Sequence, residues 1–372
     1  MKTRLLLTLM PILAVSCIDT PDTLSGTIIF VSDRAGNQDI WSMNADGSNV
    51  RQLTTHPGLD AQPAPSADGR YIAFISDAEC PATGPDELPN TGVWVMNMDG
   101  TDPRRLTPPD GEFEEAYCFQ PAWSPDGISV VFARTKGSET LYIVPADGSA
   151  DPVALETGVG RYNPEFSPSG LDLIYDYDSG GTGWWHLYLR EMPDGIETPL
   201  ATANHSVAGA YSHIGDRIAY IHAWRPISQV RIMNWDGSND HLVIDNAAIA
   251  YDGWGQVAWS PDDSLLAVSV YNSLYPGVPE FDNFIQLVDV DTGLELYRTT
   301  TAGRNMFVYE SSLYADRHYV AANRVWSSDG SHLVFMSNRD GNWEIYCMNS
   351  DGTGEINLSQ NEAWDGNPVW VD

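Results

Sequence analysis

One polar side chain recurs at a fixed place in a repeated segment, and its type suits the binding of a polar ligand or an ion. It is a carboxamide three residues before an aromatic residue or a proline: Gln62, Gln120, Asn163, Gln256, Asn323 and Asn367. Ala208 is the exception. Each amide both donates and accepts hydrogen bonds, so a ring of them beside Asp60 and Asp365 could hold a ligand. In the structural alternative, each amide bridges backbone groups of neighbouring strands or holds ordered water.

Histidines are the second candidates for chemistry, because imidazole is a common ligand of transition metals. Five of them map to, or close to, one face of the repeat plan: His56, His186, His205, His222 and His318. No pair has the HxxxH spacing of a zinc site, although ligands on separate strands need only converge in space. The sequence also lacks a GxSxG nucleophile turn,. We therefore predict no catalytic residues, no bound metal and no other cofactor.

The carboxamides open a unit that occurs seven times. Its openings are QPAPSADG (62–69), QPAWSPDG (120–127), NPEFSPSG (163–170), AGAYSHIGD (208–216), QVAWSPDD (256–263), NRVWSSDG (323–330) and NPVW (367–370). Runs of β-branched and aromatic residues follow, separated by Asp-Gly turns, as in residues 28–54 and their near copy 333–359. This pattern predicts four antiparallel strands joined by hairpins. The shortest interval between openings, from Gly127 to Gly170, suits a propeller blade of roughly 40 to 50 residues.

The C-terminal opening supplies the part of the repeat that the N-terminal unit lacks. Residues 27–54 have no opening before them, and residues 368–372 are an opening with nothing after it. We predict an all-β, seven-bladed β-propeller over residues 27–372, closed by the C-terminal strand joining the N-terminal blade.

The repeat lacks the Gly-His and Trp-Asp pairs of the commoner eukaryotic propeller repeat, and over residues 27–372 it resembles the WD-like repeat of the TolB propeller family. The resemblance implies a bacterial envelope protein that organises protein partners. TolB itself has a six-bladed ring and a separate N-terminal domain, whereas here only Cys17–Gly26 separate the leader from the first strand. Oligogalacturonate lyases also resemble this repeat and place a histidine-held metal near the axis. A metal-dependent polysaccharide lyase is therefore the alternative function.

The first residues resemble a bacterial lipoprotein signal. Lys2 and Arg4 precede the apolar run from Leu5 to Leu13, and Cys17 follows small residues. The run is too short to cross a bilayer, which takes about 20 residues. We predict a signal peptide at residues 1–16 and a linker at 17–26 lipidated at Cys17, and Ile18 after the cysteine favours the outer membrane, facing the periplasm or the cell surface. An ordinary secretory signal is the alternative.

The chain is strongly acidic, with a formal net charge of −32 and Lys136 as its only lysine after the leader. Such a surface opposes binding to nucleic acid and to anionic headgroups, so we predict membrane attachment through lipid alone. Cationic ligands remain possible partners, although the charge could simply keep the protein soluble.

The remaining cysteines follow the blade plan, and secretion permits disulfides. Cys80 falls in a loop between the second and third strands of its blade, and Cys118 in the connection to the next blade. Both loop types emerge on one face, which predicts a Cys80–Cys118 disulfide. Cys347 is predicted to be a buried free thiol.

The long loops fall on that same face, at residues 77–91, 108–119, 177–184, 272–283 and 301–322, whereas the opposite face has short turns. Binding residues often sit on loops carried by a rigid scaffold. The loops are rich in aromatics, among which we select Trp184, Trp185, Trp254 and Trp364. The alternative is that these rings pack under their own loops. We predict a non-catalytic, monomeric protein that binds an envelope protein, a peptide or a glycan on this loop-rich face.

Overall fold

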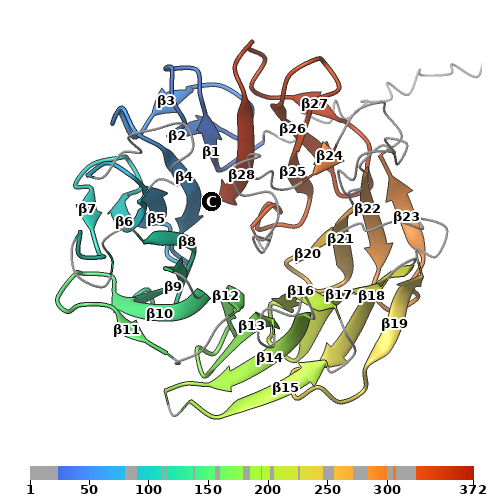
Figure 1. The fold of residues 1–372 in the computed structure, drawn as a ribbon. Helices are drawn as coiled ribbons and strands as arrows, with labels where there is room; N and C mark the ends of the chain where they lie inside the picture. Colours follow the sequence, from blue (N-terminus) through green and yellow to red (C-terminus); the bar gives the residue numbers. More distant parts are fainter. Residues whose placement is uncertain are drawn as a thin grey trace, which may run out of the picture.

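The computed structural model describes residues 24–79, 90–109, 113, 116–136, 139–155, 160–178, 185–193, 195–201, 205–224, 227–245, 255–270, 284–299, 305–306 and 324–372. It confirms the predicted all-β, seven-bladed β-propeller, with seven four-stranded antiparallel sheets around a central axis (Figure 1). These described ranges contain no helix that is long and apolar enough to cross a membrane.

Each blade is given from its inner to its outer strand. Blade 1 has β28 (Asp365–Val371), β1 (Thr27–Ser32), β2 (Asp39–Asn44) and β3 (Arg51–Gln52); blade 2 has β4 (Asp60–Pro65), β5 (Tyr71–Ser76), β6 (Gly92–Asn97) and β7 (Arg104–Arg105); blade 3 has β8 (Tyr117–Trp123), β9 (Ser129–Thr135), β10 (Glu139–Pro145) and β11 (Val153–Ala154). Blade 4 has β12 (Arg161–Phe166), β13 (Asp172–Asp178), β14 (Trp185–Glu191) and β15 (Glu197–Ala201); blade 5 has β16 (Ser206–Tyr211), β17 (Arg217–Trp224), β18 (Ile227–Asn234) and β19 (His241–Asp245). Blade 6 has β20 (Gly255–Trp259), β21 (Leu265–Val270), β22 (Phe284–Asp289) and β23 (Glu295–Arg298); blade 7 has β24 (Asn305–Met306), β25 (His332–Ser337), β26 (Glu344–Asn349) and β27 (Ile356–Asn357).

The ring closes as the sequence predicts. Strand β28 pairs antiparallel with β1, with Val371 opposite Thr27 and Asp365 opposite Ser32. Figure 1 shows the red β28 beside the blue β1, with the C-terminus close to the axis. On its other side, the Trp370 N–H donates to the carbonyl of Arg324 in blade 7 at 2.7 Å. The first and last parts of the chain therefore form one blade and hold the ring together.

Blade 7 departs from the prediction. Residues 301–322 were expected to be a loop, but Asn305–Met306 form β24 and pair with Ser337 and Met336 of β25. At the other end of the blade, Trp326 forms an isolated antiparallel bridge with Leu333. The insertion thus divides the inner edge of blade 7 into two pieces.

The hydrophobic core lies between neighbouring blades. The cluster between blades 2 and 3, for example, packs Ala73 and Val93 against Trp123 and Phe132, all nearly inaccessible to solvent. Each blade buries side chains on both faces of its sheet, as the near-continuous apolar runs in β5 and β9 require,. Every inner strand is therefore held by two neighbours, which gives the channel wall a fixed shape.

The turns between first and second strands follow from Ser-Pro-Asp-Gly chemistry. In blade 3, the Ser124 hydroxyl donates to Asp126 at 2.6 Å, and Asp126 accepts the Ile128 N–H at 3.0 Å. Gly127 has a φ of 70°, which costs glycine little because it has no Cβ,. We call these the a–b turns. They form the rim of the channel opposite the long loops.

Candidate functional site

The carboxamides stand at a bulge in the inner strands. Five members of the series have a positive φ between 51° and 55°: Gln62, Gln120, Asn163, Ala208 and Asn367. The register of the inner strand shifts at the same place, between Ala61 and Ala64 in β4 and between Phe119 and Ala122 in β8. A bulge inserts one extra residue and redirects its side chain. In β20, which holds the buried Gln256, the pairing has no register shift.

The redirected amides join neighbouring blades. The Gln62 side-chain oxygen accepts the Gln120 N–H at 2.6 Å, and the Gln120 oxygen accepts the Asn163 N–H at 2.8 Å. The Gln120 amide also donates to the Asn163 side-chain oxygen at 2.5 Å. These are the contacts that the structural alternative predicts, so the three amides stabilise the channel wall. Asn323 lies outside the described residues.

Asp176 continues the links between inner strands from blade 4 to blade 5. Its carboxylate accepts the Ala208 N–H at 3.1 and 3.2 Å and the Asn163 side-chain amide at 2.6 Å. Asp176 is 1% exposed, and burial raises its pKa to about 7, while both hydrogen bonds lower it in part. The Asn163 side-chain oxygen is bound by Gln120, so a carboxyl group from the second strand of blade 4 accepts the N–H of blade 5, as Gln62 and Gln120 accept those of the blades that follow them.

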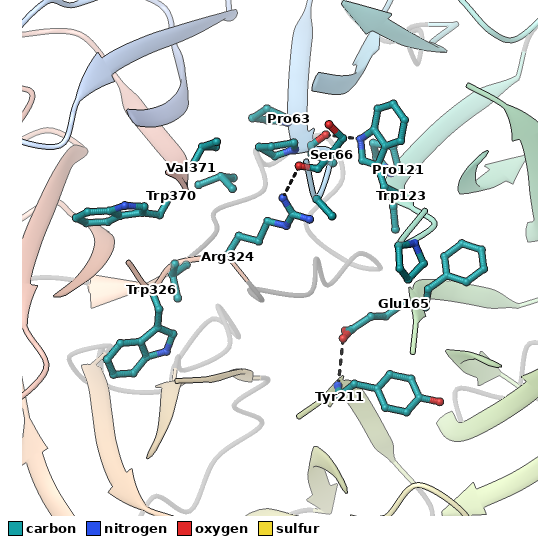
Figure 2. Close-up of a pocket in the computed structure, with 18 of the residues that line it drawn as sticks. Pro63, Ser66, Pro121, Trp123, Glu165, Tyr211, Arg324, Trp326, Trp370 and Val371 are labelled. Carbon is teal, nitrogen blue, oxygen red and sulfur yellow. Dashed lines mark hydrogen bonds between the residues drawn. The ribbon is translucent and has the colours of Figure 1, made fainter. Parts of the chain in front are cut away.

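The inner strands enclose a cavity of about 880 Å³ on the axis (Figure 2). All seven blades contribute to its lining, which runs from the carboxamides at one end to the a–b turns at the other. The wall is mostly apolar, with Pro63, Pro121, Pro164 and Pro368 directly after carboxamides. A concave, pre-formed, mostly apolar cavity with a few polar groups is typical of a binding site.

Tryptophans fix this wall in place. The indole N–H of Trp123 donates to the carbonyl of Ala64 at 2.7 Å, that of Trp259 to Ala210 at 3.0 Å, and that of Trp326 to Ala258 at 3.3 Å. Each bond joins one inner strand to that of the preceding blade. The aromatic position of the repeat thus has a structural role in the cavity wall.

Two charged side chains interrupt the apolar wall. Glu165 and Arg324 stand where the equivalent positions of the other repeats hold Pro, Gly, Ala or Val. Glu165 accepts the Tyr211 N–H at 3.1 Å. Arg324 donates to the carbonyl of Ser66 at 3.0 Å, and Figure 2 shows its side chain extended from blade 7 towards that turn of blade 2. Neither residue was predicted from the sequence, although both stand out when the equivalent positions of the repeats are aligned.

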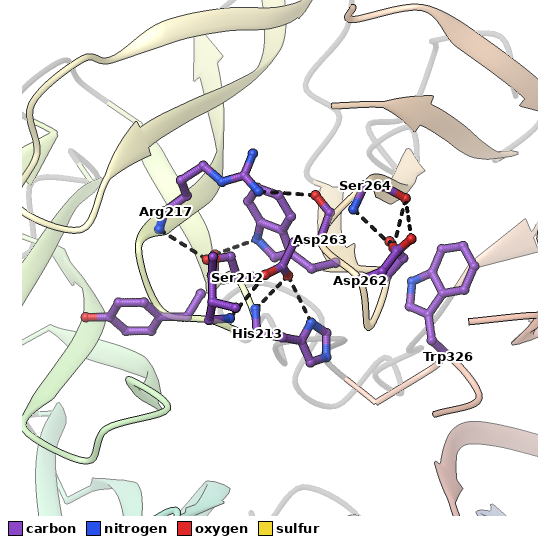
Figure 3. Close-up of polar contacts among 12 residues, drawn as sticks. Ser212, His213, Arg217, Asp262, Asp263, Ser264 and Trp326 are labelled. Atoms are coloured by element: carbon purple, nitrogen blue, oxygen red, sulfur yellow. Dashed lines mark hydrogen bonds and ion pairs between the residues drawn. The ribbon is translucent and has the colours of Figure 1, made fainter. Parts of the chain in front are cut away.

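Asp263 ties two a–b turns together at the rim of the cavity (Figure 3). It takes the place of the turn glycine and has a φ of 58°. Its carboxylate accepts the N–H groups of His213 at 2.7 Å and Ile214 at 3.1 Å, and lies 3.2 Å from the His213 ring. Arg217 donates to the Asp263 carbonyl at 3.2 Å. The rim between blades 5 and 6 is therefore fixed by one residue that breaks the repeat pattern.

Asp60 and Asp365 do not line the cavity, contrary to the expectation that they flank the channel ligand. Each begins an inner strand and is buried between blades, with 1% and 0% exposure. Asp365 accepts two hydrogen bonds from Arg34 at 2.8 and 2.9 Å. Among the described residues, neither carboxylate oxygen of Asp60 has a partner with good hydrogen-bond geometry, although the hydroxyls of Ser76 and Thr54 are near it. Burial raises the pKa of Asp60 to about 6, and the neighbouring hydroxyls of Ser76 and Thr54 lower it in part.

The aromatic residues chosen on the loop-rich face pack against the core where they are described. Trp185 is partly buried, and its ring centroid lies 4.9 Å from that of Tyr162. Trp364 is partly buried against the clusters around blade 1. Trp184 and Trp254 lie outside the described residues, as does Cys17. Their roles stay predictions.

The cysteine prediction needs one correction. Cys118 was placed in a connection between blades, but it lies within β8, fully buried, as a free thiol. Burial raises its pKa to about 12. Cys80 lies outside the described residues, so the structure gives no support to a Cys80–Cys118 disulfide, and the pairing stays a prediction. Cys347 is buried and free, as the sequence predicts.

The histidines do not assemble a metal site in the part of the chain that the structure describes. His205 lies close enough to His222 for its charge to lower the His222 pKa, after the larger effects of burial and of Arg231. No group of three or more His, Cys, Asp or Glu residues among the described positions has the geometry to hold a metal ion. His318 lies outside these positions.

Comparison with known proteins places this geometry in a wider group. No family model matches the chain. A TolB homologue of Chlorobaculum tepidum is 30% identical over 143 residues, covering 36% of this chain and 30% of the relative. The Tol-Pal system protein TolB of Francisella tularensis is 23% identical over 238 residues, covering 63% of this chain and 52% of the relative. The chain thus spans between about a third and about half of the length of these relatives.

Solved structures share the fold. A putative TolB of Agrobacterium tumefaciens has a TM-score of 0.54 at 18% identity, covering 87% of this chain and 98% of that one. An oligogalacturonate lyase of Vibrio parahaemolyticus has a TM-score of 0.56 at 14% identity, covering 91% and 87%. A puromycin-hydrolysing peptidase of Mycobacterium tuberculosis has a TM-score of 0.60 at 14% identity, covering 87% and 50%. At these identities the likeness concerns the fold alone.

The fold defines a seven-bladed β-propeller with a cavity on its axis. Among such propellers the sequence relatives are TolB proteins, and the chain is a TolB-like propeller.

Proposed function

We propose that this protein is a non-catalytic, TolB-like lipoprotein of the bacterial envelope that binds a protein partner. The observation that carries the proposal is the axial cavity of about 880 Å³, walled by rigid, mostly apolar inner strands. Such a wall suits an extended peptide segment, because the aliphatic and proline surfaces bury apolar side chains while a few polar groups fix their orientation. The TolB relatives support an envelope location and a protein ligand.

The proposal moves the binding site relative to the sequence prediction. The loop-rich face was expected to bind the ligand, whereas the described cavity extends to the a–b turns on the opposite rim. The lipid on Cys17 and outer-membrane anchoring belong to the same proposal, since the leader resembles a lipoprotein signal.

Site-specific photocrosslinking in the native cell tests this function. A photoreactive phenylalanine analogue replaces Pro125 or Ser328 at the rim of the cavity, and Leu296 on the exposed outer strand of blade 6 serves as the control. We expect the rim positions to capture one defined envelope protein that the control does not capture. An absence of rim crosslinks, or the same products from Leu296, would remove the basis for a channel-binding function.

The lyase alternative rests on likeness of fold to an oligogalacturonate lyase. It is tested by incubating the purified chain with oligogalacturonate and divalent manganese and following the absorbance of the unsaturated product. We expect no product above the background of a boiled control.

A further inference from the structure

Among the described residues that line the cavity, Arg324 is the only arginine or lysine, and its position is unusual. The two residues after the carboxamide are small or apolar in every repeat except at Glu165 and Arg324. Arg324 starts in blade 7, and its guanidinium reaches the Ser66 carbonyl in blade 2, past the inner strand of blade 1. Figure 2 shows this side chain in the space between the inner strands. The guanidinium is thus presented to whatever occupies the cavity.

The described part of the chain provides no counter-charge for Arg324. Among these residues its side chain donates to the neutral carbonyl of Ser66, and no carboxylate lies within ion-pair distance of it. Burial alone lowers its pKa, with no neighbouring acid to offset the effect. A partly buried guanidinium keeps several donors in a planar fork that matches an oxyanion. Burying an unpaired guanidinium costs free energy, and an anionic group that binds to it would offset that cost.

The other charged groups of the cavity are already paired. Asp68 binds Arg70 and the Ser66 hydroxyl, and Asp372 accepts the Ser328 N–H at 3.0 Å and the Trp370 indole at 3.1 Å. These carboxylates and Glu165 line the same cavity as Arg324 without pairing with it, and they give the cavity a negative charge. They repel a phosphate group, which carries a charge of about −1.5 to −2, more strongly than a carboxylate with a single charge.

We propose that Arg324 binds the carboxylate of an acidic side chain, Asp or Glu, carried by the protein segment that enters the channel. The bound carboxylate accepts two hydrogen bonds from the guanidinium fork while the apolar wall contacts the rest of the segment. This inference rests on the proposed function for the carrier of the carboxylate, but the site itself needs no partner to be tested.

The probe is N-acetylglutamate amide, which presents one side-chain carboxylate, with N-acetylglutamine amide as its neutral match and inorganic phosphate as the competing anion. Binding to the purified chain is followed at constant ionic strength by NMR of arginine side chains labelled with nitrogen-15. We expect saturable shifts of one guanidinium signal with the glutamate probe only. That signal is absent in Arg324→Gln.

Arg324→Gln is expected to weaken glutamate binding at least about tenfold, as removal of a charge-assisted pair does. Arg324→Lys keeps the positive charge but lacks the planar fork of donors. Its affinity for the glutamate probe is expected to lie between those of the wild type and Arg324→Gln. The matched control is Arg70→Gln, which removes a cation from the same rim, where it is already paired with Asp68, and should leave binding within twofold. Equal binding of the glutamine probe, tighter binding of phosphate, or unchanged affinity in Arg324→Gln would each overturn the proposal.

The outcome is separable from that of the proposed function. Failure of the glutamate probe with intact rim crosslinks removes the role of Arg324 and leaves partner binding in place. Glutamate binding without rim crosslinks keeps the carboxylate site and removes the protein partner as its source.

Discussion

Asp60 and Asp365 occupy equivalent positions in successive blades, yet only one of them has a cation. Their surroundings match closely: the Asp33 and Asp77 carboxylates accept the N–H groups of Trp364 and Leu59, the residues just before the two inner strands. In blade 1 the next residue is Arg34, which pairs with Asp365. In blade 2, Ala78 stands at the position of Arg34. The two positions are equivalent, because the Ala78 N–H donates to Ser76 and the Arg34 N–H donates to Ser32. Asp60 is therefore a buried acid that lacks, among the described residues, the arginine that its counterpart in blade 1 has.

Ala78→Arg should restore the missing ion pair. We expect it to raise the free energy of unfolding by about 2 kcal/mol, because a charge-assisted bond replaces an unpaired buried carboxylate. Urea unfolding of the purified chain measures the change. The gain should vanish in the Asp60→Asn background, and a gain of equal size there would show that the new arginine acts elsewhere.

Asp365→Asn, which leaves Arg34 unpaired, should instead lower the free energy of unfolding by about 3 kcal/mol.

Buried acids also set the pH dependence of stability. The folded-state pKa values of Asp60 and Asp176 are raised from 3.8 to about 6 and about 7. The folded protein therefore binds these protons more tightly than the unfolded chain, and the resulting stability is present below pH 4 and lost as the pH rises through 6 and 7. For Asp60 the loss is on the order of 3 kcal/mol.

Unfolding free energies measured between pH 4 and pH 8 should thus fall with rising pH. Asp60→Asn should flatten the curve around pH 6 and be most stabilising at pH 8. Asp68 and Asp329, whose pKa values are lowered to about 2, lose their contribution only below pH 4, so the two effects separate. A profile that rises from pH 5 to pH 8 in wild type and variant alike would contradict the assignment.

At the scale of the elements, one turn shows how a broken repeat can add stability. Asp263 adopts the left-handed backbone of the glycine it replaces, at a cost of about 1 kcal/mol, and in return accepts two N–H groups of the neighbouring blade,. Asp263→Ala keeps the backbone strain and loses the bonds, so we expect it to lower the unfolding free energy by about 2 to 3 kcal/mol. Asp263→Gly loses the same bonds without the strain and should cost about 1 kcal/mol less. A glycine variant as stable as wild type would mean that the bonds between these turns contribute nothing.

The same repeats explain what the sequence could predict about the fold. Ser-Pro-Asp-Gly turns and near-continuous apolar runs recur in most blades, so the strands, their antiparallel pairing and the closure by β28 followed from local chemistry,. The bulge at the carboxamides did not, because glutamine has no preference for a positive φ, and only pairing with two neighbouring strands forces Gln62 and Gln120 into it,. Strand β24 was missed because two residues carry no periodicity.

The site was harder to predict than the fold for a related reason. The carboxamides attracted attention because they recur, and recurrence in a ring of repeats marks what every blade needs for packing. The residues that make this channel particular, Arg324 and Glu165, are departures from the repeat. Their significance depends on which atoms face the axis and which have partners, and that information lies in the assembled ring.

At the scale of the whole molecule, the ring is held by contacts between blades rather than by the order of strands along the chain. Trp370 pairs with Ile28 in the way that Trp123 pairs with Val130 across a covalent turn in blade 3. A Ser-Pro-Asp-Gly segment joining Asp372 to Ser25 should therefore make blade 1 resemble the others. New termini between Ala150 and Asp151 open an exposed turn of blade 3, where chain breaks are tolerated best.

This circular permutant of residues 25–372 should fold and unfold cooperatively, with a melting temperature at or above that of the parent chain, because the closing contact becomes local and costs less chain entropy. Calorimetry compares the two. Deleting residues 365–372 from the parent chain, which removes β28 and the partners of β1, should abolish the cooperative transition. If the permutant melts well below the parent while the deletion is tolerated, the closing pair contributes little, and the packing of the other six blades alone keeps the channel in shape.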